Sequence, residues 1–321
     1  MLAHEKEIIE YQKTLKQLKE QNETSSMWSD HEITQFETKL DELKDKVYSQ
    51  LTPWDRVSIA RHPERPKSLD YIRNICDDFV EIYGDRLFAD DKAIIAGFAR
   101  IDGVKFLVVA QEKGFDTQSR LKRNFGMPHP EGYRKAMRCM RLAAKFNLPV
   151  LSLVDTPGAY PGLAAEERGQ AGAIAQNLFE MARLPTPVIV LLIGEGGSGG
   201  AIGMGVGDAI GMLEHAYYSV ISPEGCASIL WKDTKKNQQA ASSLQMHVEK
   251  LVEFGVVDEM IPEPLGGAHQ DPSVVYKGAK FFIKKEWDRI KSLSIDSLLE
   301  QRYQKFRKLG KFLESDYLDS E

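Results

Sequence analysis

Residues 194–208 read GEGGSGGAIGMGVGD, and more than half of them are glycine. The stretch follows directly after the apolar run 188–193, so it lies where a predicted buried strand ends. If a helix begins near Ser198, the turn 197–200 presents free backbone amides and the positive end of the helix dipole. Such a turn predicts a site for an anion. The glycines at 199, 203 and 207 would also give the helix a face without side chains, which allows very close packing.

The stretch also fits the dinucleotide-binding fingerprint, as Gly194-x-Gly196-x-x-Gly199. Glu214 follows at the spacing of a ribose ligand. The fingerprint usually opens the first βαβ unit of a domain, whereas this stretch lies past the middle of the chain.

The same residues fit a second motif, the nucleophile elbow of hydrolases, as Gly196-x-Ser198-x-Gly200. Asp258 and His269 follow in the chain order of a catalytic triad, although a sequence with many acidic residues often supplies that order. A third interpretation needs no ligand. Close packing of a small-residue helix on a sheet explains the glycines at 203, 205 and 207, but it explains the segment 196–200 poorly.

The composition restricts the class of protein. The 321 residues are 42% hydrophobic, which is enough for a buried core, and a net charge of −5 gives no general attraction to nucleic acid or to an anionic membrane. The first residues lack a signal-peptide pattern, and no apolar run approaches the roughly 18 residues of a membrane span, so we expect a cytoplasmic protein. Cys76, Cys139 and Cys226 are too far apart for a CxxC-based zinc site, and we expect no metal in this chain.

The first fifty residues contain neither glycine nor proline and predict a helical hairpin. Apolar residues recur at three-and-four spacing within 8–18 and within 33–47, which places each set along one helical stripe. Ser29 and Glu32 form a capping-box pattern at the start of the second helix. We therefore expect a helical arm over residues 1–52, followed by a linker with little periodicity over 53–68.

The rest of the chain alternates between strand and helix patterns. The runs 93–100 and 104–110 predict a hairpin that turns at Gly103. Beyond it, the expected strands (150–154, 188–193, 217–221 and 255–261) alternate with expected helices (130–146, 166–183 and 223–231). This alternation predicts an α/β fold with parallel strands, whose ligand site lies where the strands end. We expect this domain over 69–291 and a helical tail over 292–321.

Long motifs in a fixed order identify a family. They include RNFGMP at 123–128, PEGYRK at 130–135, DTPGAYPG at 155–162, GEGGSGGA at 194–201 and SVISPEGCASILW at 219–231. Over most of its length the chain resembles the alpha subunit of the bacterial and plastid acetyl-CoA carboxylase carboxyltransferase. The resemblance implies a crotonase-like (ClpP/crotonase) fold of ββα superhelical units, with the helical hairpin as an N-terminal arm.

The resemblance also implies a reaction and partners. In this family a carboxyl group passes from carboxybiotin, held on the biotin carboxyl carrier protein, to acetyl-CoA, which gives malonyl-CoA for fatty acid biosynthesis. The enzyme is an α2β2 assembly whose beta subunit carries a zinc ribbon, and biotin carboxylase is its companion. The reaction needs neither a nucleic acid nor a membrane.

By motif, the backbone amides of Gly199 and Gly200 are expected to be the catalytic oxyanion donors to the ureido oxygen of biotin. One preorganised donor of this kind is worth about 100- to 1000-fold in rate. Further substrate contacts are expected from the same turn and from two loops at strand ends: Gly196, Gly197 and Ser198; Thr156, Pro157 and Gly158; and Pro223, Glu224 and Gly225. Ser198 is expected to hold the turn or to cap the helix.

Two other functions stay open on the residues alone. One is a self-sufficient hydratase or isomerase of the crotonase type, and the other is a non-catalytic assembly subunit whose arm recruits partners. A group of basic residues over 120–141 has two interpretations, as a contact for CoA or the carrier protein and as a solvated helix face.

Overall fold

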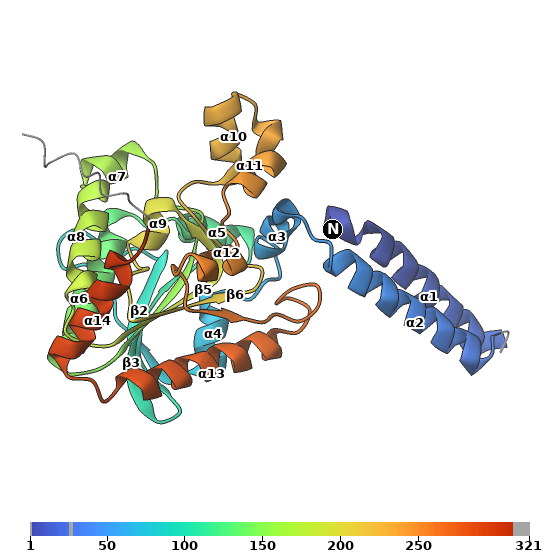
Figure 1. Cartoon of the computed structure of the whole chain (residues 1–321), viewed down its shortest axis with the longest axis horizontal. Coiled ribbons are helices and arrows are strands. Elements are labelled where there is room, and N and C mark those ends of the chain that lie inside the picture. Colours follow the sequence, from blue (N-terminus) through green and yellow to red (C-terminus); the bar gives the residue numbers. More distant parts are fainter. Residues whose placement is uncertain (1, 26–27, 311–321) are drawn as a thin grey trace, which may run out of the picture.

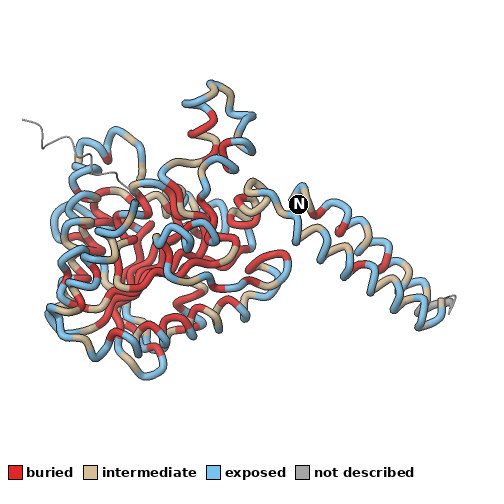
Figure 2. The backbone as a smooth tube through the Cα atoms, in the orientation of Figure 1, coloured by how far each residue is buried: buried red, intermediate tan, exposed pale blue. Residues whose placement is uncertain are grey.

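The N-terminal arm projects from one side of the molecule (Figure 1). The computed structural model describes residues 2–25 and 28–310, and in it α1 (Lys6–Ser25) and α2 (Asp30–Tyr48) pack against each other. The capping box is confirmed, because the Ser29 hydroxyl accepts from the Glu32 amide at 3.3 Å while the Glu32 carboxylate accepts from the Ser29 amide at 2.8 Å. The predicted hairpin forms, and apolar residues of its two helices pack against each other between them. Few other residues of the arm are buried (Figure 2).

The segment 53–68 is not the irregular linker expected from its prolines. Residues Pro53–Ala60 form helix α3, in which proline occupies the first turn and Thr52 caps the amide of Asp55. Proline is compatible with this position because its missing amide would have no acceptor there. Val57 and Ile59 are fully buried. The segment therefore anchors the arm to the body through the buried face of α3.

A mixed sheet of eight strands forms the centre of the body that the structure describes. Its order is β1-β2-β3-β4-β5-β6-β8, with β7 paired to β5. The pairs β1–β2 and β2–β3 are antiparallel, and the remaining pairs are parallel, as the alternating pattern predicted. The strands are β1 (Asp77–Glu81), β2 (Ile94–Ile101), β3 (Val104–Gln111), β4 (Val150–Thr156), β5 (Val188–Gly197), β6 (Ala209–Leu213), β7 (Tyr217–Ser219) and β8 (Glu259–Ile261).

Helices surround this sheet, and α10 with α11 forms a second projection (Figure 1). Strands β4 and β5 are buried along their whole length, which explains why their sequences are mostly apolar. The further helices are α4 (Ser68–Ile75), α5 (Thr117–Lys122), α6 (Pro130–Lys145), α7 (Leu163–Glu167), α8 (Gln170–Ala182), α9 (Ser198–Ile202), α10 (Pro223–Trp231), α11 (Asn237–Ser243), α12 (Val248–Glu253), α13 (Pro272–Ile290) and α14 (Ile295–Arg307).

Three sequence predictions differ from the structure in detail. The expected helix 166–183 is two helices, α7 and α8, because Gly169 adopts a left-handed φ of 82° between them. Strand β5 continues through Gly197, and α9 ends at Ile202, so the expected long helix with glycines at 199, 203 and 207 does not form. The tail 292–321 contains α14, and its residues 311–321 lie outside the described residues.

No helix within 2–25 and 28–310 combines the length and apolarity needed to cross a membrane. The predicted hairpin between β2 and β3 does form, with Asp102 and Gly103 at positive φ in its turn. Since β3, β4 and β5 are parallel neighbours, their carboxyl ends lie at one edge of the sheet. In sheets of this kind that edge is the usual place of a ligand site.

Candidate functional site

The glycine-rich turn connects the end of β5 to the start of α9. Ser198 adopts a left-handed φ of 50°, and Gly197 occupies the N-cap position without a side-chain cap. The first amides of a helix have no acceptor within it. Gly199 and Gly200 are the second and third residues of α9, so their amides belong to this first turn. The turn therefore places two adjacent amides where the helix itself provides no acceptor.

Packing explains most of the glycines in this turn. A Cβ on Gly197 would overlap the carbonyl of Pro157, and a Cβ on Gly200 would overlap the backbone of Gly158. A Cβ on Gly196 would lie 2.7 Å from the Leu192 side chain. The expectation that ligand approach accounts for the run 196–200 better than packing does is therefore wrong for these three positions.

Gly199 is different from its neighbours. A Cβ built on it would meet only the Ile174 side chain, at 3.4 Å, and its backbone lines an open hollow. By contrast, the packing interpretation is confirmed at Gly203, Gly205 and Gly207, where a Cβ would come within 2.9 Å or less of the Tyr133 ring, the Tyr218 hydroxyl and the Val188 carbonyl.

The hollow beside Gly199 has a volume of about 530 Å³ and an apolar lining. Its wall includes Ser198 and Gly199 from the turn together with side chains from α8, α12, β6, β7 and the C-terminal helix, among them Leu178, Ile210, Tyr218, Val220, Leu251 and Phe306. Val220 is 77% exposed, so the hollow opens at the surface of the chain. It has the size and apolar character of a small-molecule site.

The positive φ of Ser198, at a junction of strand and helix, is the backbone geometry of a nucleophile elbow. The other triad members are absent from the site. No described residue that lines the hollow carries a carboxylate, an imidazole or an amine. Asp258 pairs with Lys305, and the His269 ring stacks on His62 at a centroid distance of 3.7 Å. The triad is therefore not assembled, and the expected capping role of Ser198 is also wrong because the N-cap is Gly197.

The dinucleotide interpretation has no support in the geometry either. The Glu214 carboxylate accepts a hydrogen bond from the Glu263 amide at 3.0 Å, and its carbonyl accepts from Arg56. Glu214 is therefore held within the chain by contacts that connect β6 and β8.

The loop 156–158 packs directly against the glycine turn. The Thr156 hydroxyl donates to the Gly158 carbonyl at 2.7 Å and accepts from the Gly158 amide at 3.1 Å, which closes a tight local turn. Pro157 lies on the wall of a different cavity from the one at Gly199. The structure thus brings the segments 156–158 and 196–200 together.

The third predicted segment forms the first turn of α10. The Ser222 hydroxyl accepts from the Gly225 amide at 3.1 Å, and Pro223 occupies the first helical position. The Glu224 carboxylate pairs with Arg61 at 2.5 Å. Arg61 also pairs with Glu195 on β5, so this turn is connected to the strand that carries the glycine stretch. None of Pro223, Glu224 and Gly225 lines the hollow at Gly199.

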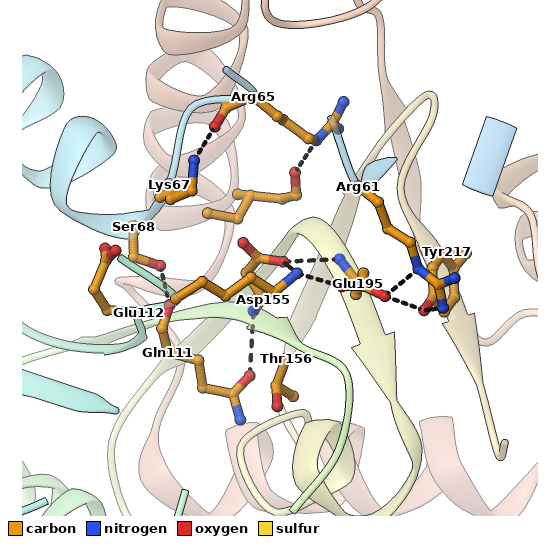
Figure 3. A network of polar contacts seen from close by, with 12 residues as sticks. Arg61, Arg65, Lys67, Ser68, Gln111, Glu112, Asp155, Thr156, Glu195 and Tyr217 are labelled. Atoms are coloured by element: carbon orange, nitrogen blue, oxygen red, sulfur yellow. Dashed lines mark hydrogen bonds and ion pairs between the residues drawn. The ribbon is translucent and has the colours of Figure 1, made fainter. Parts of the chain in front are cut away.

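A network of charged side chains lies at the carboxyl ends of β3, β4 and β5 (Figure 3). Lys113 pairs with Asp155 at 2.6 Å and with Glu195 at 2.7 Å, while Arg61 pairs with Glu195 at 2.7 Å. The Tyr217 hydroxyl donates to Glu195 at 2.5 Å. Burial by itself raises the pKa of Glu195, but Lys113 and Arg61 outweigh it and lower that pKa to about 2. The network holds the strand ends that carry the glycine turn and the 156–158 loop.

Sequence analysis did not predict this network. A usable signal was present, because Asp155 and Glu195 are acidic residues at the ends of otherwise apolar runs. Their partners could not be found that way. Arg61 lies 134 residues from Glu195 in sequence, and Lys113 lies 82 residues from it.

The basic cluster over 120–141 is largely engaged by the chain itself. Lys135 is fully buried against Asp90 at 2.7 Å, and Arg134 pairs with Asp85 at 2.8 Å. For these members the solvated-face interpretation is wrong. Among residues 2–25 and 28–310, no group of three or more histidine, cysteine or carboxylate side chains is placed to hold a metal ion.

Comparison with known proteins shows the family and the fold. The family described as acetyl co-enzyme A carboxylase carboxyltransferase-like matches residues 1–310. The acetyl-coenzyme A carboxylase carboxyl transferase subunit alpha of Chlamydia pneumoniae is 60% identical over 310 residues, which are 97% of this chain and 96% of that relative.

Two solved structures are similar at low identity. Transcarboxylase 12S, crystallised with methylmalonyl-coenzyme A and methylmalonic acid, is 20% identical with a TM-score of 0.52 over 67% of this chain and 41% of that chain. The beta subunit of geranyl-CoA carboxylase from P. aeruginosa is 15% identical with a TM-score of 0.55 over 83% of this chain and 48% of that chain. This chain spans less than half the length of either, and the likeness shows the fold alone, which is the expected crotonase-like fold.

The match to the family and to its relative extends over almost the whole chain. The chain therefore belongs to the family of acetyl-coenzyme A carboxylase carboxyltransferase alpha subunits, the family that its motifs resemble.

Proposed function

We propose that this chain forms half of a carboxyltransferase active site, which transfers a carboxyl group from carboxybiotin on a carrier protein to acetyl-CoA and yields malonyl-CoA. A beta subunit with a zinc ribbon completes the site in an α2β2 enzyme, and biotin carboxylase supplies the carboxylated carrier. The enzyme works in the cytoplasm. Biotin brings the transferable carboxyl group and a ureido oxygen that becomes negatively charged when that group leaves.

One observation carries the proposal: the adjacent amides of Gly199 and Gly200 lie in the first turn of a helix, which provides them no acceptor, and Gly199 lines an apolar hollow. A fused bicyclic ring needs an apolar wall, and a developing oxyanion needs fixed donors. The chain supplies both in one place. Donors that are already fixed by the fold need no reorganisation when charge develops, which is the main source of such stabilisation.

The other predicted contacts have supporting roles. Pro157 and Gly158 pack on the glycine turn and fix its position, while Thr156 closes their loop. Gly196 and Gly197 extend β5 to the turn, and Ser198 contributes its backbone to the wall of the hollow. The turn at Pro223, Glu224 and Gly225 is connected through the Arg61–Glu224 ion pair to Glu195 on β5.

The test exploits the difference between Gly199 and Gly200. Gly200→Val is a poor choice because its Cβ would overlap the Gly158 backbone and disturb the fold. Gly199→Ala is tolerated sterically, since its Cβ lies 3.4 Å from a flexible isoleucine end, yet the new methyl group restricts approach to the amides. Gly172→Ala is the matched control, because a Cβ there meets nothing within 4 Å.

Malonyl-CoA formation is measured with the beta subunit, carboxybiotin and acetyl-CoA. We expect the rate of Gly199→Ala to fall about 100-fold, the lower range for loss of one oxyanion donor, and that of Gly172→Ala to stay at the parent value. Full activity of Gly199→Ala would refute the role of the turn. Activity of this chain without the beta subunit would favour a self-sufficient enzyme.

A further inference from the structure

A second cavity, of about 270 Å³, lies at the carboxyl ends of β3, β4 and β5. It is lined by the charged network and the segment 60–67, and it shares no residue with the hollow at Gly199. Three arginines and two lysines line it, whereas Asp155 and Glu195 are its acidic side chains. This excess of positive charge needs an explanation.

Three of the five cations are neutralised by the chain. Lys113 pairs with Asp155 and Glu195, and Arg65 forms two hydrogen bonds of 2.8 and 2.5 Å with the Glu263 carboxylate. Arg61 pairs with the carboxylates of Glu195 and Glu224.

The other two cations, Lys67 and Arg120, form no ion pair within the described part of the chain. The Lys67 ammonium donates to the carbonyls of Pro63 at 2.7 Å and Arg65 at 3.1 Å, and Arg120 Nε approaches the Gly114 carbonyl at 3.4 Å. An ammonium has three donors and a guanidinium has five, so each side chain keeps donors for a ligand in the cavity.

Lys67 is only 8% exposed, which makes its unpaired charge costly. Burial and, to a smaller degree, the nearby charge of Arg120 lower the pKa of Lys67, although the carboxylates of Asp155 and Glu112 oppose this. Two unpaired cations that repel each other across one cavity would be stabilised by an anion between them.

The rim of the cavity is also strained. Asn124 and Phe125 both adopt left-handed backbone conformations, with φ of 49° and 55°, although neither is glycine. The Phe125 side chain lines the cavity, and the residue is 48% exposed. Consecutive residues in this region of φ are unfavourable and are found most often at ligand sites.

We propose that this cavity binds a small oxyanion, a phosphate or a carboxylate, between Lys67 and Arg120, with Phe125 against its less polar part. A volume of about 270 Å³ corresponds to about nine waters at roughly 30 Å³ each, so the part of the ligand inside the cavity is small. This inference does not depend on carboxyl transfer, because it rests on a separate cavity and on Lys67, Arg120 and Phe125, which have no part in the proposed function.

Calorimetric titration of the full chain tests the proposal with two probes, inorganic phosphate and malonate, at constant ionic strength. The variant is Arg120→Gln, and the control is Lys122→Gln, which removes one positive charge from the same helix outside the cavity. We expect saturable binding to the parent chain, weakened about 10- to 100-fold in Arg120→Gln, as for loss of a charged hydrogen bond. The control should bind as the parent does.

Lys67→Met is a second variant with the same expectation, and circular dichroism verifies that each variant is folded. The probe that binds more tightly identifies the ligand as phosphate-like or carboxylate-like. Absence of saturable binding of both probes to the parent chain would overturn the proposal. Equal weakening in Lys122→Gln and Arg120→Gln would also overturn it, because that result indicates diffuse attraction to surface charge.

Discussion

Replacing Glu195 by glutamine tests whether the charged network holds the strand ends that carry the candidate site. The side chain keeps its shape but loses its charge. Lys113 then keeps only Asp155 as a carboxylate partner, and Arg61 keeps only Glu224. The variant therefore weakens the two ion pairs through which Glu195 connects β5 to the end of β3 and to the end of α3.

The magnitude follows from the pKa of the carboxyl group. Folding lowers the pKa of Glu195 from 4.5 to about 2, with burial opposed by Lys113 and Arg61. One pKa unit corresponds to about 1.4 kcal/mol, so the ionised carboxylate contributes about 3 kcal/mol to the free energy of unfolding at pH 7. Breaking a buried ion pair from one side costs a similar 3 to 5 kcal/mol or so.

The sign of the pH dependence is fixed by the lowered pKa. The contribution of Glu195 is complete above pH 4.5 and is lost as the pH falls toward 2. Urea denaturation followed by tryptophan fluorescence should therefore show a gap of about 3 kcal/mol between parent and Glu195→Gln at pH 7. The difference in the free energy of unfolding between the parent and Glu195→Gln should become smaller below pH 4.5.

Glu224→Gln is the matched control, because its side chain belongs to the same network but is 38% exposed. Exposed ion pairs contribute about 1 kcal/mol or less, so this variant should remain close to the parent. If Glu195→Gln is no less stable than Glu224→Gln at pH 7, the network is not what holds the strand ends.

Two further predictions concern stability away from the site. Arg302→Met should lower the free energy of unfolding in urea by about 3 to 5 kcal/mol, because Arg302 is 1% exposed and its loss leaves the buried Asp208 carboxylate without its ion-pair partner. Arg307→Met, on the exposed side of the same helix, should change the free energy of unfolding by less than about 0.5 kcal/mol. Equal effects of the two substitutions would show that the buried Arg302–Asp208 ion pair does not stabilise the fold. Burial raises the pKa of Asp91 from 3.8 to about 6, so Asp91 should make stability decline as pH rises from 4 to 6. Asp91→Asn should remove that decline in denaturation curves recorded across this range, and an unchanged decline would show that another group causes it.

Local sequence signals predicted much of the architecture. The capping box at Ser29, the turn at Gly103 and the helix that begins at Pro130 all depend on residues a few positions apart, and all three form. The runs that form β4 and β5 are predictable because strands buried on both faces are mostly apolar. The motifs named the family, and the comparisons agree with it.

Where one local pattern is compatible with two structures, the prediction from sequence is wrong in two places. Prolines suggested a linker at 53–68, although proline also opens helices, and burial of Val57 and Ile59 decided the outcome. Glycines four residues apart suggested one long helix, but the chain stays extended through Gly197 and the helix ends at Ile202. Residues nearby in sequence do not indicate which structure forms at either place, because the residues that pack against these segments are distant in sequence.

The sequence by itself determined the alternating strands and helices, the helical arm and the start of a helix near Ser198, since each depends on periodicity or on adjacent residues. Only the tertiary structure decided why each glycine is there. Gly200 meets the backbone of Gly158, whereas Gly199 borders open space. Tertiary structure also decided which cations keep free donors, because ion pairs such as Arg61 with Glu195 join residues 134 positions apart and depend on distance in space alone.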